Sequence, residues 1–286
     1  MPQIRCILAP NPSPMTLHGT NSYLVGTGDL ALIDPGPNIP AHARAIMAAL
    51  NPGERITHIL VTHAHTDHSP LAPIMAQALH IKTHAFGPAT AGRSPAMTAL
   101  ATQGLIAGGE GVDHAFTPDI PLQDNETLSH NDWALRAIHT PGHLSNHLCL
   151  ALGQTLFTGD HIMGWSSSLI SPPDGDMAAY MAATRHLATQ DWVLFHAGHG
   201  APITDPHTRL TQTLHHREQR AASILDALAC GPKTIPDLTA NLYADTPKTL
   251  HPAAARNILA HLIDLTAQNR TTAHPTLALN ATYTLA

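Results

Sequence analysis

A run of four side chains that can bind metal, His63-Ala64-His65-Thr66-Asp67-His68, follows directly after a β-branched apolar stretch at residues 55–62. Imidazole and carboxylate groups are ligands of zinc, iron and manganese. The histidines at 63 and 65 can close on one ion, whereas the adjacent Asp-His pair is free for a second. The alternative is a surface cluster that arises by chance, since the chain has 23 histidines. The spacing is specific enough to favour a metal site on a loop after a strand.

Three later polar residues also stand where a strand is expected to end. They are His143 in His139-Thr140-Pro141-Gly142-His143, Asp160 in Leu156-Phe157-Thr158-Gly159-Asp160, and His199 in His196-Ala197-Gly198-His199-Gly200. Each one alone is a weak signal, because an aspartate or histidine beside glycine is commonly a turn residue. A rigid sheet can, however, aim side chains from several strand ends at one point. Together with the first motif, the three residues form an ordered series of metal ligands.

The pattern of apolar residues changes near residue 205. Before it, short apolar runs alternate with turn signals and helical stretches, which is typical of a layered domain of strands and helices. After it come three helical segments and a β-like tail, at residues 208–229, 235–243, 252–268 and 271–285. That order of elements is the order of a winged-helix module. We therefore expect an α+β chain with a catalytic domain at residues 1–205 and a small winged-helix-like domain at 206–286.

The ordered series of motifs resembles that of the metallo-β-lactamase superfamily. The resemblance covers roughly residues 15–205 and includes Asp34 in Ile33-Asp34-Pro35-Gly36. Gly19-Thr20-Asn21-Ser22-Tyr23 and the appended winged helix are similar to one branch, the β-lactamase-like-protein-2 group, whose characterised members include endoribonucleases. The resemblance implies an αββα sandwich and a hydrolytic enzyme.

The resemblance also implies two divalent metal ions, with zinc as the first expectation and manganese or iron as alternatives. His63, His65 and His143 would hold the first ion, Asp67, His68 and His199 the second, and Asp160 would bridge the two. A hydroxide that bridges the two ions would be the nucleophile. Asp67 is also expected to orient that nucleophile, and His161 is a candidate general acid. Asp34 is expected to fix the ligand loop, or else to be a simple turn aspartate.

Three functions fit these features. The first is hydrolysis of phosphodiesters in RNA or nucleotides, and the second is hydrolysis of a small ester, a lactone or a thioester, as in glyoxalase II. The third is a nucleic-acid-binding regulator with a structural metal domain. Residues 206–286 contain seven basic and five acidic residues, and the third helical segment offers only Arg256 and the nearby Arg270. Because nucleic-acid affinity depends on such cations, we expect the tail to form a homodimer contact or a wall over the active site.

The expected location is the cytoplasm, and the expected partner is a small-molecule or short nucleic-acid substrate. No apolar run approaches the roughly 18 residues that span a bilayer, and the first residues lack the apolar core of a secretory signal. Cys6, Cys149 and Cys230 are scattered without a CxxC spacing, which argues against a disulfide framework or a cysteine zinc site.

Overall fold

Two β-sheets form the first part of the chain in the computed structural model, which describes residues 2–105 and 111–286. The first sheet has the strand order β1 (Ile4–Leu8), β2 (Asn21–Val25), β3 (Asp29–Ile33), β4 (Arg55–Leu60), β5 (Thr83–Ala85) and β6 (Ile120–Pro121). The second sheet has the order β11 (Leu194–Ala197), β10 (Thr155–Gly159), β9 (Leu148–Leu152), β8 (Trp133–His139) and β7 (Thr127–His130). Parallel pairing from β3 to β6 and between β10 and β11 brings the carboxyl ends of several strands together.

The two sheets pack face to face around an apolar core. Strand β2 is buried at all five of its positions. Because side chains alternate across a strand, Tyr23 and Val25 of β2 face the second sheet, where they meet Leu148 and Phe157. Leu24 faces the opposite way and joins the core under the helices. Burial on both faces explains why β3 and β9 are nearly continuous apolar runs.

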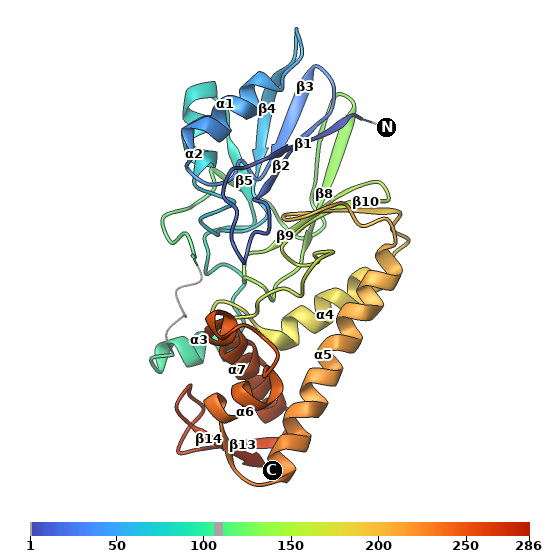
Figure 1. Cartoon of the computed structure of the whole chain (residues 1–286). Helices are drawn as coiled ribbons and strands as arrows, with labels where there is room; N and C mark the ends of the chain where they lie inside the picture. Colours follow the sequence, from blue (N-terminus) through green and yellow to red (C-terminus); the bar gives the residue numbers. More distant parts are fainter. Residues whose placement is uncertain (1, 106–110) are drawn as a thin grey trace.

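Helices cover the outer face of each sheet (Figure 1). On the first sheet these are α1 (Pro40–Ala48) and α2 (Leu71–Leu79), which bury Ile46 and Met75. On the second sheet they are α4 (Met177–Ala188) and the first turns of α5 (Pro206–Ala229), which place Leu187 and Leu210 against Phe195. The layers are helix, sheet, sheet and helix, so the α+β sandwich that the sequence predicts is confirmed.

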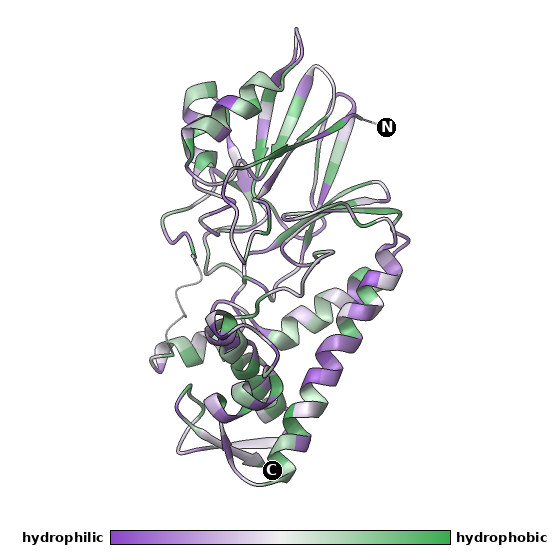
Figure 2. Ribbon diagram, in the orientation of Figure 1, coloured by the Kyte–Doolittle hydropathy of each residue, from purple (hydrophilic) through white to green (hydrophobic). Residues whose placement is uncertain are grey.

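The C-terminal part has its own apolar core. It consists of the end of α5, α6 (Ile235–Leu242), a 3-10 turn at Lys248–Leu250, α7 (His251–Ala267) and the small sheet of β12 (Lys233–Thr234), β14 (Thr282–Leu285) and β13 (Thr271–His274). Helix α7 is largely hydrophobic in Figure 2 and is the central helix, because its Ile258, Leu259 and Leu262 are fully buried. Helix α3 (Pro95–Thr102) adds Met97 to this core from the first part of the chain. The predicted order of helices and hairpin is therefore present.

Helix α5 links the two parts. It begins at Pro206, where the Asp205 side chain accepts a hydrogen bond from Thr208 N at 3.1 Å and so caps the helix. Its first half packs on the second sheet, and Ile224 and Leu228 near its end enter the C-terminal core. One long helix thus belongs to both cores, and the division of the chain at residue 205 stays a prediction.

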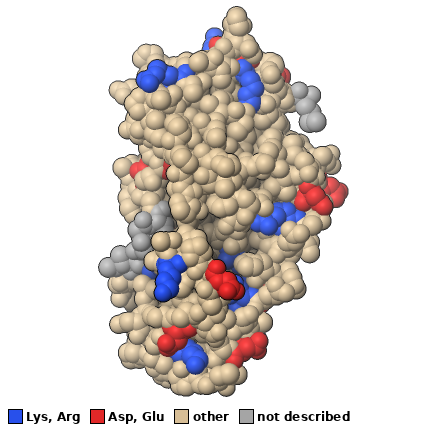
Figure 3. Space-filling model, in the orientation of Figure 1, with Lys and Arg blue, Asp and Glu red and all other residues tan. Residues whose placement is uncertain are grey.

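The surface and the helices bear on possible partners. In the face shown in Figure 3, Lys and Arg side chains lie apart, several of them next to acidic side chains. Arg256, which the sequence places on a candidate recognition helix, is only 6% exposed. It therefore offers no charge to a nucleic acid at the surface. Among the described helices, none is long and apolar enough to cross a membrane.

Candidate metal centre

Seven side chains at one edge of the sandwich form the candidate centre. The histidine motif follows β4, and the three later residues follow β8, β10 and β11. The structure brings them together in three groups, namely His63, His65 and His143; His63, His68 and Asp160; and Asp67, His68 and His199. Within each group the ligand atoms lie within 4.8 Å of one another. Every metal ligand that the sequence predicts is therefore part of one cluster.

The first group consists of three buried imidazoles. His65 Nδ1 lies 2.9 Å from His63 Nε2 and 3.0 Å from His143 Nε2. Two nitrogens of a tetrahedral zinc site lie about 3.3 Å apart when each Zn–N bond is roughly 2.0–2.1 Å. Burial lowers the pKa of His65 to about 3 and that of His63 well below its ordinary value. Three neutral imidazoles that converge in this way fit a divalent cation.

The group of Asp67, His68 and His199 includes the most accessible carboxylate of the cluster. Asp67 Oδ2 lies 3.2 Å from His199 Nε2 and 3.5 Å from His68 Nε2, and the Asp67 side chain is 24% exposed. Burial alone would lower the pKa of His199, but the Asp160 and Asp67 carboxylates raise it to about 10. In the protein without metal, protons on the imidazoles therefore balance the carboxylates, and a cation can replace them.

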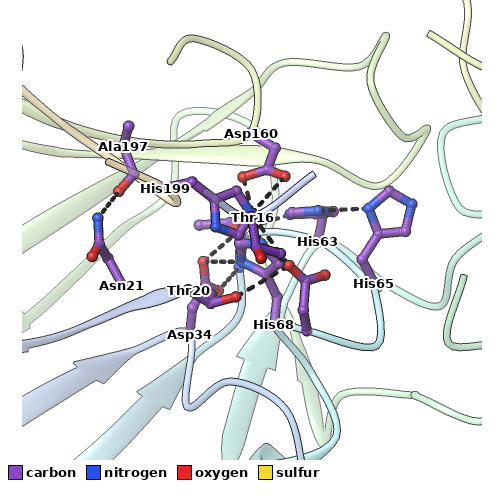
Figure 4. Close-up of polar contacts among 12 residues, drawn as sticks. Thr16, Thr20, Asn21, Asp34, His63, His65, His68, Asp160, Ala197 and His199 are labelled. Carbon is purple, nitrogen blue, oxygen red and sulfur yellow. Dashed lines mark hydrogen bonds and ion pairs between the residues drawn. The ribbon is translucent and has the colours of Figure 1, made fainter. Parts of the chain in front are cut away.

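Asp160 faces both groups. Its Oδ2 lies 3.3 Å from His199 Nε2 and 3.7 Å from His143 Nε2, and its Oδ1 lies 3.5 Å from His68 Nε2. In Figure 4, Asp160, His199 and His68 point toward one another. The buried atoms His68 Nε2 and Asp160 Oδ1 make no hydrogen bond within the described part of the chain, and the ion-pair contacts of His68 Nε2 with Asp160 and Asp67 are 3.5 Å long. Since a buried polar atom without a hydrogen bond is costly, these two atoms fit metal ligation.

Backbone carbonyls set the orientation of two imidazoles. His143 Nδ1 donates to Leu169 O at 2.7 Å, and His199 Nδ1 donates to Gly19 O at 3.0 Å. A carbonyl oxygen only accepts, so a neutral ring here, as His199 becomes when a cation replaces its second proton, has its proton on Nδ1 and its lone pair on Nε2. Both Nε2 atoms face the cluster, as a metal ligand requires.

Asp34 holds the histidine loop, as one of the two sequence-based interpretations has it. Its buried carboxylate accepts hydrogen bonds from Thr62 N and Thr62 Oγ1, both at 2.7 Å. It also accepts from His68 Nδ1 at 2.9 Å. Three donors from one loop thus converge on this carboxylate, which explains why it is more than a turn residue.

The segment 19–23 supports the cluster in a way that the sequence did not indicate. Thr20 Oγ1 accepts a hydrogen bond from Asn11 Nδ2 at 3.0 Å and donates to Asp67 Oδ2 at 3.1 Å. Asn21 Nδ2 donates to Ala197 O at 3.0 Å, which fixes the turn before His199 (Figure 4). In the sequence this segment served only as a mark of family resemblance. The signal in the sequence was the position of Thr20, a polar residue between two strands, which could have marked it as a contact of the site.

His161 lies apart from the cluster groups. Its ring is fully buried, its Nε2 lies 3.0 Å from Thr184 Oγ1, and burial lowers its pKa to about 3. Its neighbour His147 accepts a hydrogen bond from Asp160 N at 3.2 Å and so holds the backbone that carries the Asp160 side chain. The role of His161 as a general acid stays a prediction, and its contacts favour a role in packing.

A small pocket adjoins the first group of ligands. It is lined by His65, Val112, His143, Leu144, Leu169, Ser171 and Asp174. Leu169, Ser171 and Asp174 belong to the loop between β10 and α4. Trp165, at the start of the same loop, is 37% exposed and is not among the lining residues.

Comparison with known families agrees with the architecture. A model described as the metallo-β-lactamase superfamily matches residues 15–199. A second model, described as the β-lactamase-associated winged helix domain, matches residues 234–276. The structure of a metallo-β-lactamase family protein from Thermus thermophilus aligns with a TM-score of 0.78 at 22% identity, over 99% of this chain and 98% of that one. The two proteins therefore share a fold along their whole length.

Two curated relatives align with most of the chain. The lactamase-like protein nscB of Aspergillus fumigatus is 32% identical over 78% of this chain and 60% of its own length. The atrochrysone carboxyl ACP thioesterase dmxR1 of Cryptosporiopsis sp. is 30% identical over 79% of this chain and 63% of its own length. The chain thus spans about three fifths of the length of these relatives.

Proposed function

This chain belongs to the metallo-β-lactamase superfamily of hydrolases, and from that premise we propose that it hydrolyses a small acyl substrate with two metal ions. We assign His63, His65 and His143 to one ion, Asp67, His68 and His199 to the other, and Asp160 to both. The convergence of these atoms and the two buried atoms without hydrogen bonds support the assignment. Imidazole and carboxylate donors suit zinc first, and manganese or iron as alternatives.

The chain's own residues prepare the reaction. When bound, two divalent ions would activate a water molecule and polarise the oxygen of the scissile group. The hydrogen bond from Thr20 fixes the Asp67 carboxylate through Oδ2, and we propose that its Oδ1 accepts a hydrogen bond from the attacking water. The Nδ1–H groups of His143 and His199 keep their Nε2 atoms turned toward the centre. Val112, Leu144 and Leu169 line the pocket beside the first group and would limit the access of bulk water to the reacting group.

The lining of the pocket is the observation that carries the substrate class. No Lys or Arg is among its described lining residues, which are Val112, Leu144, Leu169, Ser171, Asp174 and two imidazoles. Arg93, a nearby cation, is paired with Asp174, with Nη2 at 2.5 Å from Oδ1. A phosphodiester is an anion and favours a cationic site, whereas the carbonyl of an ester or thioester is neutral. The name of the relative dmxR1 supports a thioester in particular.

Phosphodiester hydrolysis, the first expectation from the sequence, is the competing proposal. Its support is the dinuclear arrangement of ligands, which also serves phosphoryl transfer. A nucleic-acid-binding regulator has less support, because superfamily membership and an accessible Asp67 favour an enzyme. A homodimer through the C-terminal domain and a cytoplasmic location stay predictions.

A substrate panel tests the proposal. The protein loaded with zinc, and separately with manganese, is assayed with S-lactoylglutathione, an acyl N-acetylcysteamine thioester and a lactone. The same preparations are assayed with bis-p-nitrophenyl phosphate, a short RNA and a β-lactam. We expect the highest kcat/KM for a thioester, at least tenfold above that for either phosphodiester. Faster cleavage of RNA or of bis-p-nitrophenyl phosphate would refute the acyl proposal.

A further inference from the structure

Two buried arginines of the C-terminal part reach the loop that borders the metal centre. Arg217 lies on α5 and is 2% exposed, and Arg256 lies on α7 and is 6% exposed. Both point to residues 168–172, which belong to the loop between β10 and α4. Arginine is rarely buried this deeply without a partner that requires it. The hydrogen-bond acceptors of Arg217 and Arg256 therefore indicate the role of these two side chains.

The acceptors are mainly backbone carbonyl oxygens of that loop. Arg217 Nη2 donates to Ser168 O, and Arg256 Nη2 donates to Pro172 O. Arg256 Nε also donates to Ser171 Oγ at 2.9 Å. The loop is thus held at both ends of a five-residue segment.

Asn257 of α7 holds the middle of the segment. Its Oδ1 accepts a hydrogen bond from Ile170 N at 3.0 Å and lies 3.4 Å from Arg217 Nη1. The Ile170 side chain packs in an apolar cluster with Tyr180 of α4 and Ala260 of α7. Residues 168–172 therefore have polar and apolar contacts with the C-terminal helices.

The same segment contacts two candidate metal ligands. Leu169 O accepts the hydrogen bond from His143 Nδ1 at 2.7 Å. Ser168 Oγ donates to Asp160 O at 2.6 Å. Each arginine is thus separated from a ligand by one short stretch of backbone. A shift of this backbone would rotate the His143 ring or move the Asp160 loop.

We infer that Arg217, Arg256 and Asn257 are positioning residues for the metal centre. They fix residues 168–172, and through this segment they fix the orientation of His143 and the place of Asp160. The winged-helix domain then forms part of the active site, because its buried arginines fix a loop that contacts the metal centre. This inference rests on the metal site of the proposed function.

Metal affinity and hydrogen exchange together test the inference. The variants are Arg217→Met, Arg256→Met and Asn257→Ala, and the matched control is Arg220→Met. Arg220 lies on the same helix as Arg217, donates to Leu242 O at 2.8 Å and stacks over Tyr243, both within the C-terminal part. Zinc affinity is measured by competition with a chromophoric chelator. Amide exchange of residues 165–175 is measured in the metal-free, folded proteins.

The expected result is a tenfold or greater loss of affinity for at least one zinc ion in the three variants, as is usual for residues that orient ligands. Exchange in residues 165–175 should be at least tenfold faster. The Ile170 amide loses its acceptor in Asn257→Ala and the support of that acceptor in Arg217→Met, and Arg256→Met removes the donor to Pro172 O. The control should keep its zinc affinity within twofold. Should the arginine variants fail to fold, Asn257→Ala decides, since it removes only one small acceptor.

Three outcomes overturn the inference. They are unchanged zinc affinity in a folded variant, unchanged exchange of the loop, and an equal loss of affinity in Arg220→Met. A wild-type protein that binds no zinc, manganese or iron would instead refute the proposed function. Loop exchange separates the two cases, because it reports the hold of the arginines on the loop whether or not metal binds.

Discussion

Replacement of Asp34 by alanine should destabilise the protein far more than the loss of a surface carboxylate with similar hydrogen bonds. The carboxylate is 2% exposed and accepts from Thr62 N, Thr62 Oγ1 and His68 Nδ1. In the variant, the Thr62 hydroxyl can turn to His63 Nδ1, which lies 3.0 Å away. The other two donors stay buried without an acceptor, at about 1–3 kcal/mol each. The expected loss is therefore about 2–6 kcal/mol of unfolding free energy.

Asp132→Ala is the matched control for this prediction. Asp132 also accepts from the amide and hydroxyl of one threonine, Thr27, at 3.3 and 2.7 Å, but both residues are exposed. Water replaces the lost acceptor there, so the loss should stay below about 1 kcal/mol. Urea denaturation of the metal-free proteins, followed by circular dichroism, measures both changes. Equal losses in the two variants would show that the Asp34 carboxylate does not hold the ligand loop.

Asp34→Asn distinguishes the effect of losing the carboxylate from the effect of the unusual backbone conformation at residue 34. Asp34 has a left-handed φ of 48°, a conformation that asparagine tolerates better than alanine. The asparagine keeps one acceptor oxygen for Thr62 N, but its amide places a donor opposite His68 Nδ1. We expect it to retain more stability than Asp34→Ala and still to bind zinc at least tenfold more weakly than the wild type. Wild-type zinc affinity in a folded Asp34→Asn protein would contradict this role.

The candidate centre leads to four further predictions. Metal analysis of the purified protein should give close to two ions per chain, and an active protein without metal would refute the proposed mechanism. Asp67→Ala should abolish hydrolysis and leave the circular dichroism spectrum unchanged; full activity would rule out its role. The metal-free protein should lose unfolding free energy as the pH rises from about 6.5, the ordinary pKa of histidine, toward 10. The reason is that burial lowers the pKa of His199 but the Asp160 and Asp67 carboxylates outweigh it and raise the pKa to about 10. His199→Asn should flatten that alkaline decline, and a decline of the same size would refute it. His161→Gln should reduce thermal stability more than kcat, and the reverse would support a general acid.

The sequence was sufficient to predict which side chains gather in the cluster, because they follow a local rule. Each one stands within eight residues of the end of a strand, and apolar residues mark those strands in the sequence. Parallel pairing places the ends of β10 and β11 side by side, whereas the approach of β4 and β8 to them depends on how the two sheets pack. The pattern of apolar runs predicts a layered domain of strands and helices, and the αββα order of its layers came from the family resemblance. The Thr20 hydroxyl escaped prediction, since its contact with Asp67 joins residues 47 positions apart.

The arginines show why the C-terminal part resisted the same approach. In the sequence, Arg256 is a cation on the third helical segment, and its side chain would be expected at the surface. The structure places it in the boundary between two cores, where α5 and α7 pack beside the loop 168–172. The sequence of α7 alone does not predict this contact, because the contact depends on how the C-terminal part packs against the first part of the chain. The shortage of Lys and Arg argues against nucleic acid as a partner of this tail. The position of the buried Arg217 and Arg256 favours a tail that supports the metal centre through the loop 168–172.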